Sequence, residues 1–216
     1  MVGDTYHEGV IFHLNLLQED IESIRRTLQT YIENEAYTDQ ILDAYGINEG
    51  LPHEELLLRV EHMCGDAIFK IPNYVLAQEC LSTKMLHGNS LFLYHFDQRS
   101  RIPNTFEGTA YHAHELLYLF GNLDNAFNED ERHMAREFAS AWIRFVNGLQ
   151  PWDGSEKQWM VWGPDSSVTL KSEEEDDITR DYGRMKMVLS LGNGEAWKKW
   201  LAGVDALVNH RQHWQE

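Results

Sequence analysis

The sequence predicts an α/β fold that is rich in helices and has few strands. Apolar residues recur every three or four positions over long stretches, as in amphipathic helices, and the clearest stripe covers residues 14–33. The period changes at residues 90–96, a short aromatic-rich run that is typical of a buried strand. Two further short runs, residues 158–163 and 167–171, predict a β-hairpin.

The composition is that of an ordinary folded protein with an excess of acidic residues. The 216 residues are 43% apolar, and 18 basic against 35 acidic side chains give a net charge of −17. This charge disfavours nucleic acid or an anionic membrane as the main partner. No apolar run reaches the roughly 20 residues of a membrane span, and no signal peptide is visible, so we expect a soluble protein, cytoplasmic or secreted. Cys64 and Cys80 either pair across neighbouring helices or stay as buried thiols, which leaves the compartment open.

The first half of the chain is predicted to be mainly helical. After the first stripe, we expect a short helix with Thr38 as its N-cap, and Pro52 and Pro72 each suit the start of another. Gly88 is expected to end the last of these helices.

The second half mixes loops with further helices. Helices are expected at residues 113–120, after the capping box Asn128–Glu131, and at residues 195–208. Residues 97–110 have the composition of a loop, and the acidic run Glu173–Asp177 is interpreted as a solvated loop. Since no internal repeat or linker is visible, a single folded unit is the simplest expectation.

His112 is the candidate residue for proton transfer. It follows the predicted strand and its loop and precedes an apolar helix, and a loop at the edge of a sheet suits a histidine that moves protons. Such a base needs a carboxylate to hold its tautomer, and Glu8, in a loop-like segment beside Gly9, is the candidate. The alternative is a surface or helix-capping histidine, since the chain has 11 histidines.

A metal site is the competing interpretation of the same stretch. His112, His114 and Glu115 offer three kinds of ligand close together. On a helix, however, side chains two residues apart point away from each other, and ligand pairs fall more usefully at i and i+4. We therefore expect no metal and no cofactor.

Several segments occur in an order that is similar to a known family. They are His7-Glu8-Gly9, the helices that follow, the aromatic strand, His112-Ala113-His114-Glu115 before Leu-Leu-Tyr-Leu-Phe-Gly, Phe145-Val146-Asn147-Gly148, Pro151-Trp152 and the run from Trp159 to Pro164. This order resembles the type B carboxylesterase and cholinesterase family over roughly residues 1–165. The resemblance implies that residues 1–216 are the C-terminal portion of an α/β-hydrolase fold. A helical region would cover about residues 14–88, and a sheet strand, the histidine loop and C-terminal helices about residues 89–216.

The resemblance also implies an activity, that of a carboxylic-ester hydrolase of the serine esterase or lipase type. It assigns Glu8 as the triad acid and His112 as the triad base, with a small carboxylic ester as substrate. The serine of such enzymes lies on a G-x-S-x-G elbow. This sequence contains no such motif and no glycine-rich oxyanion segment, and neither Ser90 nor Ser166 has the required neighbours.

We therefore expect a C-terminal fragment that is inactive alone and has the missing N-terminal half as its partner. Without that half, the strand at residues 91–96 is expected to leave an open apolar edge, which would make the chain unstable, dimeric or dependent on a partner. Two alternatives stay open: a catalytically silent binding or adhesion module of the same fold, and a self-contained helical protein. Retention of Glu8 and His112 disfavours the first, and the strand and hairpin disfavour the second.

Overall fold

The structure, a computed structural model, describes residues 1–83, 90–153 and 157–209. The helix end expected at Gly88 lies outside these residues. Among the described residues, no helix combines the length and the apolar character needed to cross a membrane.

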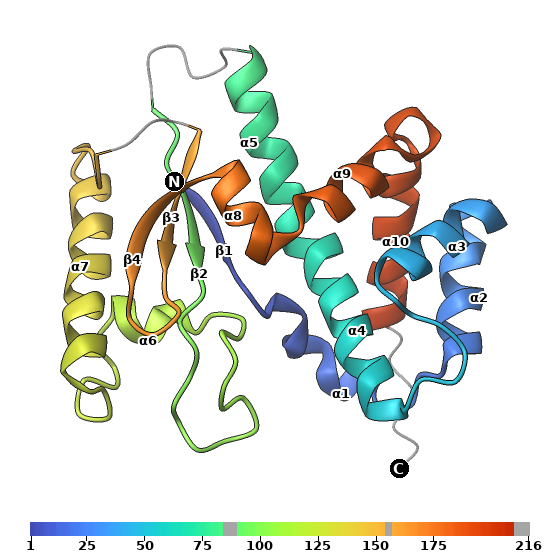
Figure 1. Cartoon of the computed structure of the whole chain (residues 1–216), viewed down its shortest axis with the longest axis horizontal. Coiled ribbons are helices and arrows are strands. Elements are labelled where there is room, and N and C mark those ends of the chain that lie inside the picture. Colours follow the sequence, from blue (N-terminus) through green and yellow to red (C-terminus); the bar gives the residue numbers. More distant parts are fainter. Residues whose placement is uncertain (84–89, 154–156, 210–216) are drawn as a thin grey trace. The chain divides into compact units, whose positions relative to one another are not determined.

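The contacts of the chain group into two compact parts, each built from segments far apart in the sequence (Figure 1). The sheet part comprises Met1–His7 and Asn73–Arg180, and the helical part comprises Glu8–Pro72 and Asp181–Glu216. The sequence predicted a single unit because no boundary between these segments has the composition of a linker.

The sheet part contains a four-stranded sheet of order β1-β2-β3-β4. Its strands are β1 (Val2–Thr5), β2 (Leu93–Phe96), β3 (Gln158–Trp162) and β4 (Val168–Ser172). β1 and β3 pair with β2 in parallel, and β4 pairs antiparallel with β3, so the predicted hairpin is confirmed.

The open edge predicted for the aromatic strand is wrong. Within the described sheet, β2 is paired on both sides by strands of this same chain, and β1 forms the edge instead. β1 was not predicted, because the run Val2-Gly3-Asp4-Thr5 is too short to show an alternation of apolar and polar residues.

One face of the sheet carries the apolar core of this part. Helices α6 (Glu115–Leu119) and α7 (Glu129–Val146) pack against it, and Figure 1 shows α7 running alongside the strands. The buried residues include Tyr94, Phe96, Tyr118, Phe138, Met160 and Trp162. The predicted capping box of α7 is confirmed, since Asn128 and Glu131 exchange two hydrogen bonds of 2.8 Å.

The expected solvated loop at Glu173–Asp177 is wrong, because these residues begin helix α8 (Glu173–Arg180). Asp176 is fully buried although it lies within the acidic run. One face of α8 contacts β3 and β4. Lys171 of β4 lies 3.6 Å and His95 of β2 lies 3.3 Å from the Asp176 carboxylate. The sequence suggested a solvated segment because it does not show the side chains from other elements that contact Asp176 in the folded chain.

The helical part consists of helices joined by short turns. They are α1 (His13–Leu16), α2 (Ile21–Ile32), α3 (Glu35–Ala44), α4 (His53–Gly65), α9 (Tyr182–Ser190) and α10 (Ala196–Asn209), with the short 3₁₀ segments η1 (Glu8–Phe12) and η3 (Leu191–Gly194). α2 and α10 pack side by side (Figure 1). α10 confirms the helix predicted at residues 195–208, whereas α9 was not predicted.

Three helix boundaries differ from the prediction for local reasons. The stripe at residues 14–33 divides into α1 and α2, because Asp20 caps α2 by accepting from the Ser23 amide at 2.8 Å. α3 is capped by Asn34, so Thr38 lies inside the helix and is buried. Pro72 does not begin a separate helix: α4 continues through a π-helical segment, η2 (Asp66–Lys70), into α5 (Ile71–Thr83). Proline has no N–H to donate to the helical hydrogen-bond pattern. The wider turn of η2, which precedes Pro72, suits such a residue.

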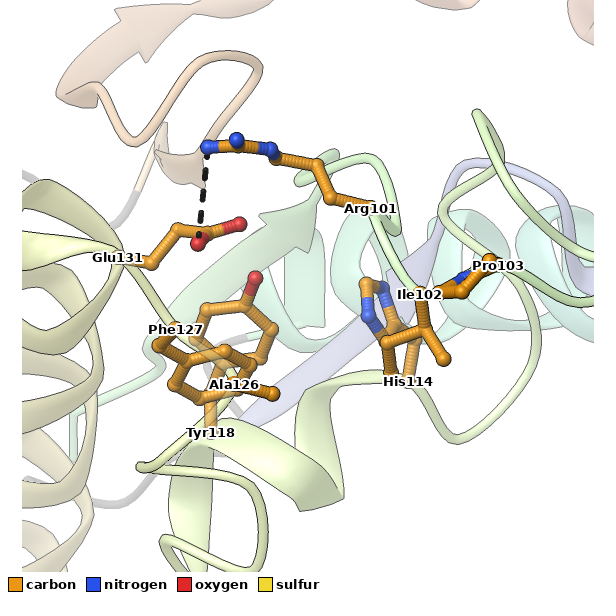
Figure 2. A pocket seen from close by; sticks show the side chains of 8 residues that line it. All are labelled: Arg101, Ile102, Pro103, His114, Tyr118, Ala126, Phe127 and Glu131. Carbon is orange, nitrogen blue, oxygen red and sulfur yellow. Dashed lines mark ion pairs between the residues drawn. The ribbon is translucent and has the colours of Figure 1, made fainter.

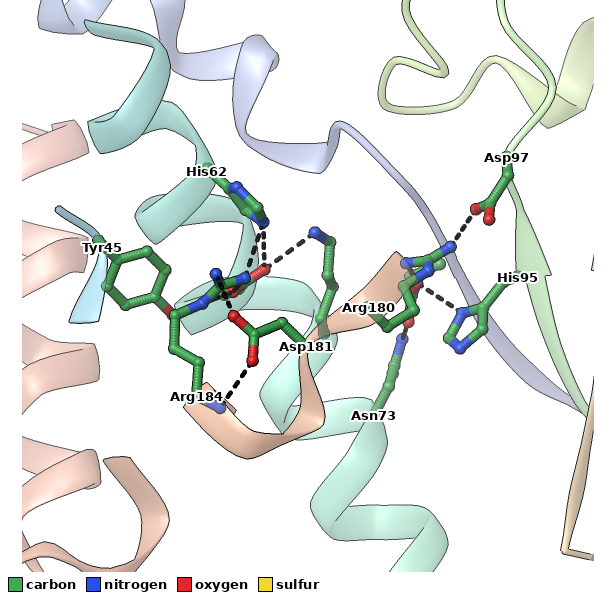
Figure 3. Close-up of polar contacts among 11 residues, drawn as sticks. Tyr45, His62, Asn73, His95, Asp97, Arg180, Asp181 and Arg184 are labelled. Atoms are coloured by element: carbon green, nitrogen blue, oxygen red, sulfur yellow. Dashed lines mark hydrogen bonds and ion pairs between the residues drawn. The ribbon is translucent and has the colours of Figure 1, made fainter. Parts of the chain in front are cut away.

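A buried carboxylate holds the helical part together. Asp66 is fully buried. It accepts from the Tyr45 hydroxyl at 3.0 Å and from Arg184 at 3.1 Å, and it forms an ion pair of 2.9 Å with Lys70. Figure 3 shows Tyr45, His62 and Arg184 converging on this point. Burial alone would raise the pKa of Asp66, but Lys70, His62 and Arg184 outweigh it and lower the pKa below its ordinary range. The cluster therefore ties α4 and η2 to α9.

The two cysteines do not form a disulfide. Cys64 is a buried free thiol and Cys80 a partly buried one. Burial raises the pKa of Cys64, so this thiol is unreactive.

Candidate active site

Glu8 begins the helical part, directly after His7. It is the first residue of η1, and the residue is 5% exposed. η1 packs against α4, and a Cβ on Gly9 would lie 1.7 Å from the backbone oxygen of Glu61. Since only glycine fits this approach, the residue after Glu8 holds η1 tightly against α4.

Gly65, at the end of α4, makes the reciprocal contact. A Cβ on Gly65 would lie 2.7 Å from the Gly9 nitrogen and 3.4 Å from Glu8 Cβ. Glycine weakens a helix by about 1 kcal/mol relative to alanine, so a glycine within a helix often marks a close backbone approach. The two glycines together fix the position of Glu8 on α4.

His112 lies in the sheet part, on the turn after the long loop that follows β2, and is half-buried. The preceding residue, Tyr111, forms a parallel β-bridge with His7. The His7 amide donates to the Ala110 carbonyl at 2.9 Å, and the Ala110 amide donates to His7 Nδ1 at 3.0 Å. The backbone that follows β1 is thereby joined to the backbone that precedes His112.

Ala113 bends the chain between the two neighbouring histidines. Its φ of 63° lies in the left-handed region, which costs a residue with a Cβ about 1–2 kcal/mol. Because of this turn, α6 begins at Glu115 and not at Ala113 as predicted. His112 and His114 consequently have different surroundings.

His114 is a buried, neutral histidine. Its Nδ1 lies 3.0 Å from the carbonyl oxygen of Gln98, and since a carbonyl only accepts, Nδ1 carries the proton. The ring stacks on Tyr111 with 4.5 Å between centroids. Burial lowers the pKa of His114 to about 4, although the bond to Gln98 opposes this shift.

A cavity of about 140 Å³ adjoins His114 (Figure 2). Tyr118 and Phe127 form apolar walls, and Arg101 Nη1 lies 3.9 Å from Glu131 Oε2. Burial, with the charge of Glu131, raises the pKa of Tyr118, so its hydroxyl stays protonated. The cavity has room for a few water molecules but is smaller than the usual 300 Å³ or more of a ligand pocket.

The two predicted site residues fall in different compact parts of the chain. The structure brings together the backbone just before each of them, through His7 and Tyr111. The pairing of the Glu8 and His112 side chains stays a prediction. Sequence reasoning missed the supporting residues Gly65 and Ala113, although a glycine inside a helical pattern was a readable signal for the first.

The metal interpretation finds no further support. Within residues 1–83, 90–153 and 157–209, no group of three or more His, Cys, Asp or Glu side chains is arranged to hold a metal ion. His114 is instead bonded to the backbone of Gln98.

Comparisons with known proteins agree with this fold. A model of the carboxylesterase family matches residues 1–189. Lipase 3 of Yarrowia lipolytica is 27% identical over 154 residues, which are 71% of this chain and 29% of the lipase.

Two solved structures share the fold at low sequence identity. PNB esterase has a TM-score of 0.57 and 21% identity, over 85% of this chain and 37% of the esterase. EstA of Aspergillus niger has a TM-score of 0.64 and 19% identity, over 87% of this chain and 39% of EstA. The predicted class, a helix-rich portion of an α/β-hydrolase fold with a small sheet, is confirmed. The chain spans well under half the length of each of these relatives.

Proposed function

Because this chain belongs to the carboxylesterase family, we propose that it contributes the acid and the base of an ester-hydrolysing triad. Glu8 is the acid and His112 the base. The observation that carries the proposal is the β-bridge between His7 and Tyr111, because it joins the backbone immediately before both residues.

The two residues would act together on a small carboxylic ester. His112 takes the proton of a serine as that serine attacks the ester carbonyl, and Glu8 orients the ring and stabilises the imidazolium. His112 then protonates the leaving alcohol and activates the water that releases the acid.

The state of His114 supports the choice of His112. A proton shuttle at neutral pH needs a pKa near the working pH and an accessible ring nitrogen. His114 has a pKa of about 4, and its Nδ1 is engaged by Gln98. Of the two neighbouring histidines, the half-buried His112 is therefore the one suited to proton transfer.

The nucleophile comes from a segment outside these 216 residues, since the sequence has no G-x-S-x-G elbow. Oxyanion donors contribute about 10²–10³ in rate each, so the chain alone should show no appreciable ester hydrolysis. β1 lies at the edge of the described sheet, where a strand of the absent half would be added.

The test is an assay with a short-chain p-nitrophenyl ester, on the chain alone and on a fusion in which it replaces the matching segment of Lipase 3. We expect no turnover from the chain alone and measurable turnover from the fusion. His112→Ala and Glu8→Gln should each lower the turnover of the fusion about 10⁴-fold or more. His133→Ala is the matched control, because the His133 side chain is 66% exposed, and it should leave turnover unchanged.

Three results would contradict the proposal. Turnover by the chain alone that His112→Ala abolishes would place a nucleophile within these residues. Turnover of the fusion that survives His112→Ala would remove His112 from the reaction. A folded fusion with an intact serine and no turnover would favour a catalytically silent member of the fold.

A further inference from the structure

The acidic helix α8 supplies a buried ion cluster to the sheet part. Asp176 and Arg180, one turn apart, are 0% and 2% exposed. Arg180 Nη1 donates to Asp4 Oδ1 at 2.7 Å, and Arg180 Nη2 donates to Asp97. Figure 3 shows Arg180 extending toward Asp97 and His95.

His95 lies between two carboxylates in this cluster. Its Nδ1 is 2.9 Å from Asp4 Oδ1, and its Nε2 is 3.3 Å from Asp176 Oδ2. Asp4 of β1 and His95 of β2 are partners in the parallel register, so their side chains share one face of the sheet. We call Asp4, His95, Asp176 and Arg180 the α8 clasp.

The geometry requires both ring nitrogens of His95 to donate. An ionised carboxylate only accepts hydrogen bonds, and a neutral imidazole has one donor, so only the imidazolium satisfies both Asp4 and Asp176. The ring also lies flat on Trp159, with 4.1 Å between centroids and 5° between planes. The face of a tryptophan favours a cation at this position.

A proton on His95 adds a positive charge where, among the contacts of the described residues named below, the carboxylates outnumber the Arg and Lys cations. Among the described residues, the groups that contact it include Asp4 of β1, Asp97 after β2, Lys171 of β4, Asp176 and Arg180 of α8, and the neutral Asn73 of α5, which bonds the Gly3 carbonyl. The Tyr6 ring also lies against Arg180, with 5.3 Å from the guanidinium carbon to the ring centroid. In their ordinary ionised forms, the carboxylates number three and the Arg and Lys cations two. His95 supplies the third positive charge, and burying an uncompensated carboxylate would be costly.

We propose that the α8 clasp closes only when His95 is an imidazolium, so that one proton couples α8 to β1 and β2. The direction of the pKa of His95 agrees with this geometry. Burial and the Arg180 charge lower the pKa, but Asp4 and Asp176 outweigh them and raise it above its ordinary value of 6.5. The inference is independent of ester hydrolysis.

The clasp makes folding depend on pH in a defined window. Since the pKa of His95 is higher in the folded chain, its stabilisation is fully present below pH 6.5 and is lost as the pH rises through the folded pKa. Within that window, the ratio of folded to unfolded chain falls by up to about tenfold per pH unit.

Nitrogen-15 NMR of the full chain at pH 6 measures the protonation of each ring directly. We expect two protonated nitrogens on His95 and one, Nδ1, on His114, which serves as an internal reference for a buried neutral ring. Asp176→Asn should shift the titration of His95 to lower pH. A neutral His95 at pH 6 overturns the proposal, because a pKa raised above 6.5 keeps the ring mostly protonated there.

Urea unfolding from pH 6 to pH 9 tests the coupling. His95→Gln should abolish most of the alkaline fall in the folded-to-unfolded ratio, whereas His114→Gln should retain it. An unchanged pH dependence in His95→Gln overturns the proposal. If His95→Gln does not fold, the ring protonation measured in the unsubstituted chain decides the question by itself.

Discussion

His7 pairs with Tyr111 in a parallel β-bridge, although the two residues are far apart in the sequence. β1 and β2 run parallel, so the segments that leave their carboxyl ends emerge at the same edge of the sheet. The bridge extends this pairing past the strands, to the residues just before Glu8 and His112. Ligand sites of open α/β sheets lie outside these carboxyl ends, and the bridge between His7 and Tyr111 lies just past the carboxyl end of β1.

Relieving the backbone strain at Ala113 should stabilise the chain. Ala113 has a φ of 63°, which glycine adopts without a Cβ clash. We expect Ala113→Gly to raise the free energy of unfolding by up to about 1 kcal/mol in urea unfolding. Ala141→Gly in α7 is the matched control, and it should lower stability by at least about 1 kcal/mol. Destabilisation by both substitutions would contradict the assignment of strain to Ala113.

Adding a methyl group at Gly9 should separate η1 from α4. The new Cβ of Gly9→Ala would lie 1.7 Å from the Glu61 backbone oxygen, so the backbone must shift. We expect a loss of at least about 2 kcal/mol in thermal or urea unfolding. Gly183→Ala in α9, where the nearest atom would be 3.6 Å away, should instead gain about 0.5–1 kcal/mol. Equal effects at the two glycines would argue against the close approach.

Neutralising Asp66 should leave buried cations without their partner. Asp66→Asn removes the charge that faces Lys70 and Arg184, and breaking such a buried network costs about 3–5 kcal/mol. The exposed Asp205→Asn in α10 should change stability by less than about 0.5 kcal/mol. Because the pKa of Asp66 is lowered in the folded chain, its contribution is present above pH 3.8 and is lost as the pH falls below that value. Acid unfolding curves that coincide for the two variants would refute this role.

His114 should make the stability of the chain depend on pH between about pH 4 and pH 6.5. Its pKa falls from 6.5 to about 4 on folding, so the unfolded chain binds more protons between these values and stability declines as the pH falls. The decline should total up to about 3 kcal/mol for the unsubstituted chain. His114→Gln should flatten it, as measured by urea unfolding at pH 4 to 6.5. A decline of full size in His114→Gln would show that another group is responsible.

The sequence by itself determined the features that depend on neighbours along the chain. The capping box of Asn128 and Glu131, the hairpin of β3 and β4, and α10 all follow from interactions between residues within a few positions of each other. The order of the segments around Glu8 and His112 likewise sufficed to predict the family that the comparisons show.

Only the tertiary structure decided which charged and polar side chains are buried and in what state. His95 and His114 both stack on aromatic rings, yet two carboxylates raise the pKa of the first, while burial against a single carbonyl lowers that of the second. Asp176 is buried inside an acidic run because His95, far away in the sequence, lies against it. These partners come from segments that are distant in the sequence, and neighbouring residues do not show which distant groups will meet. The charge state of each group is therefore fixed only when the chain folds.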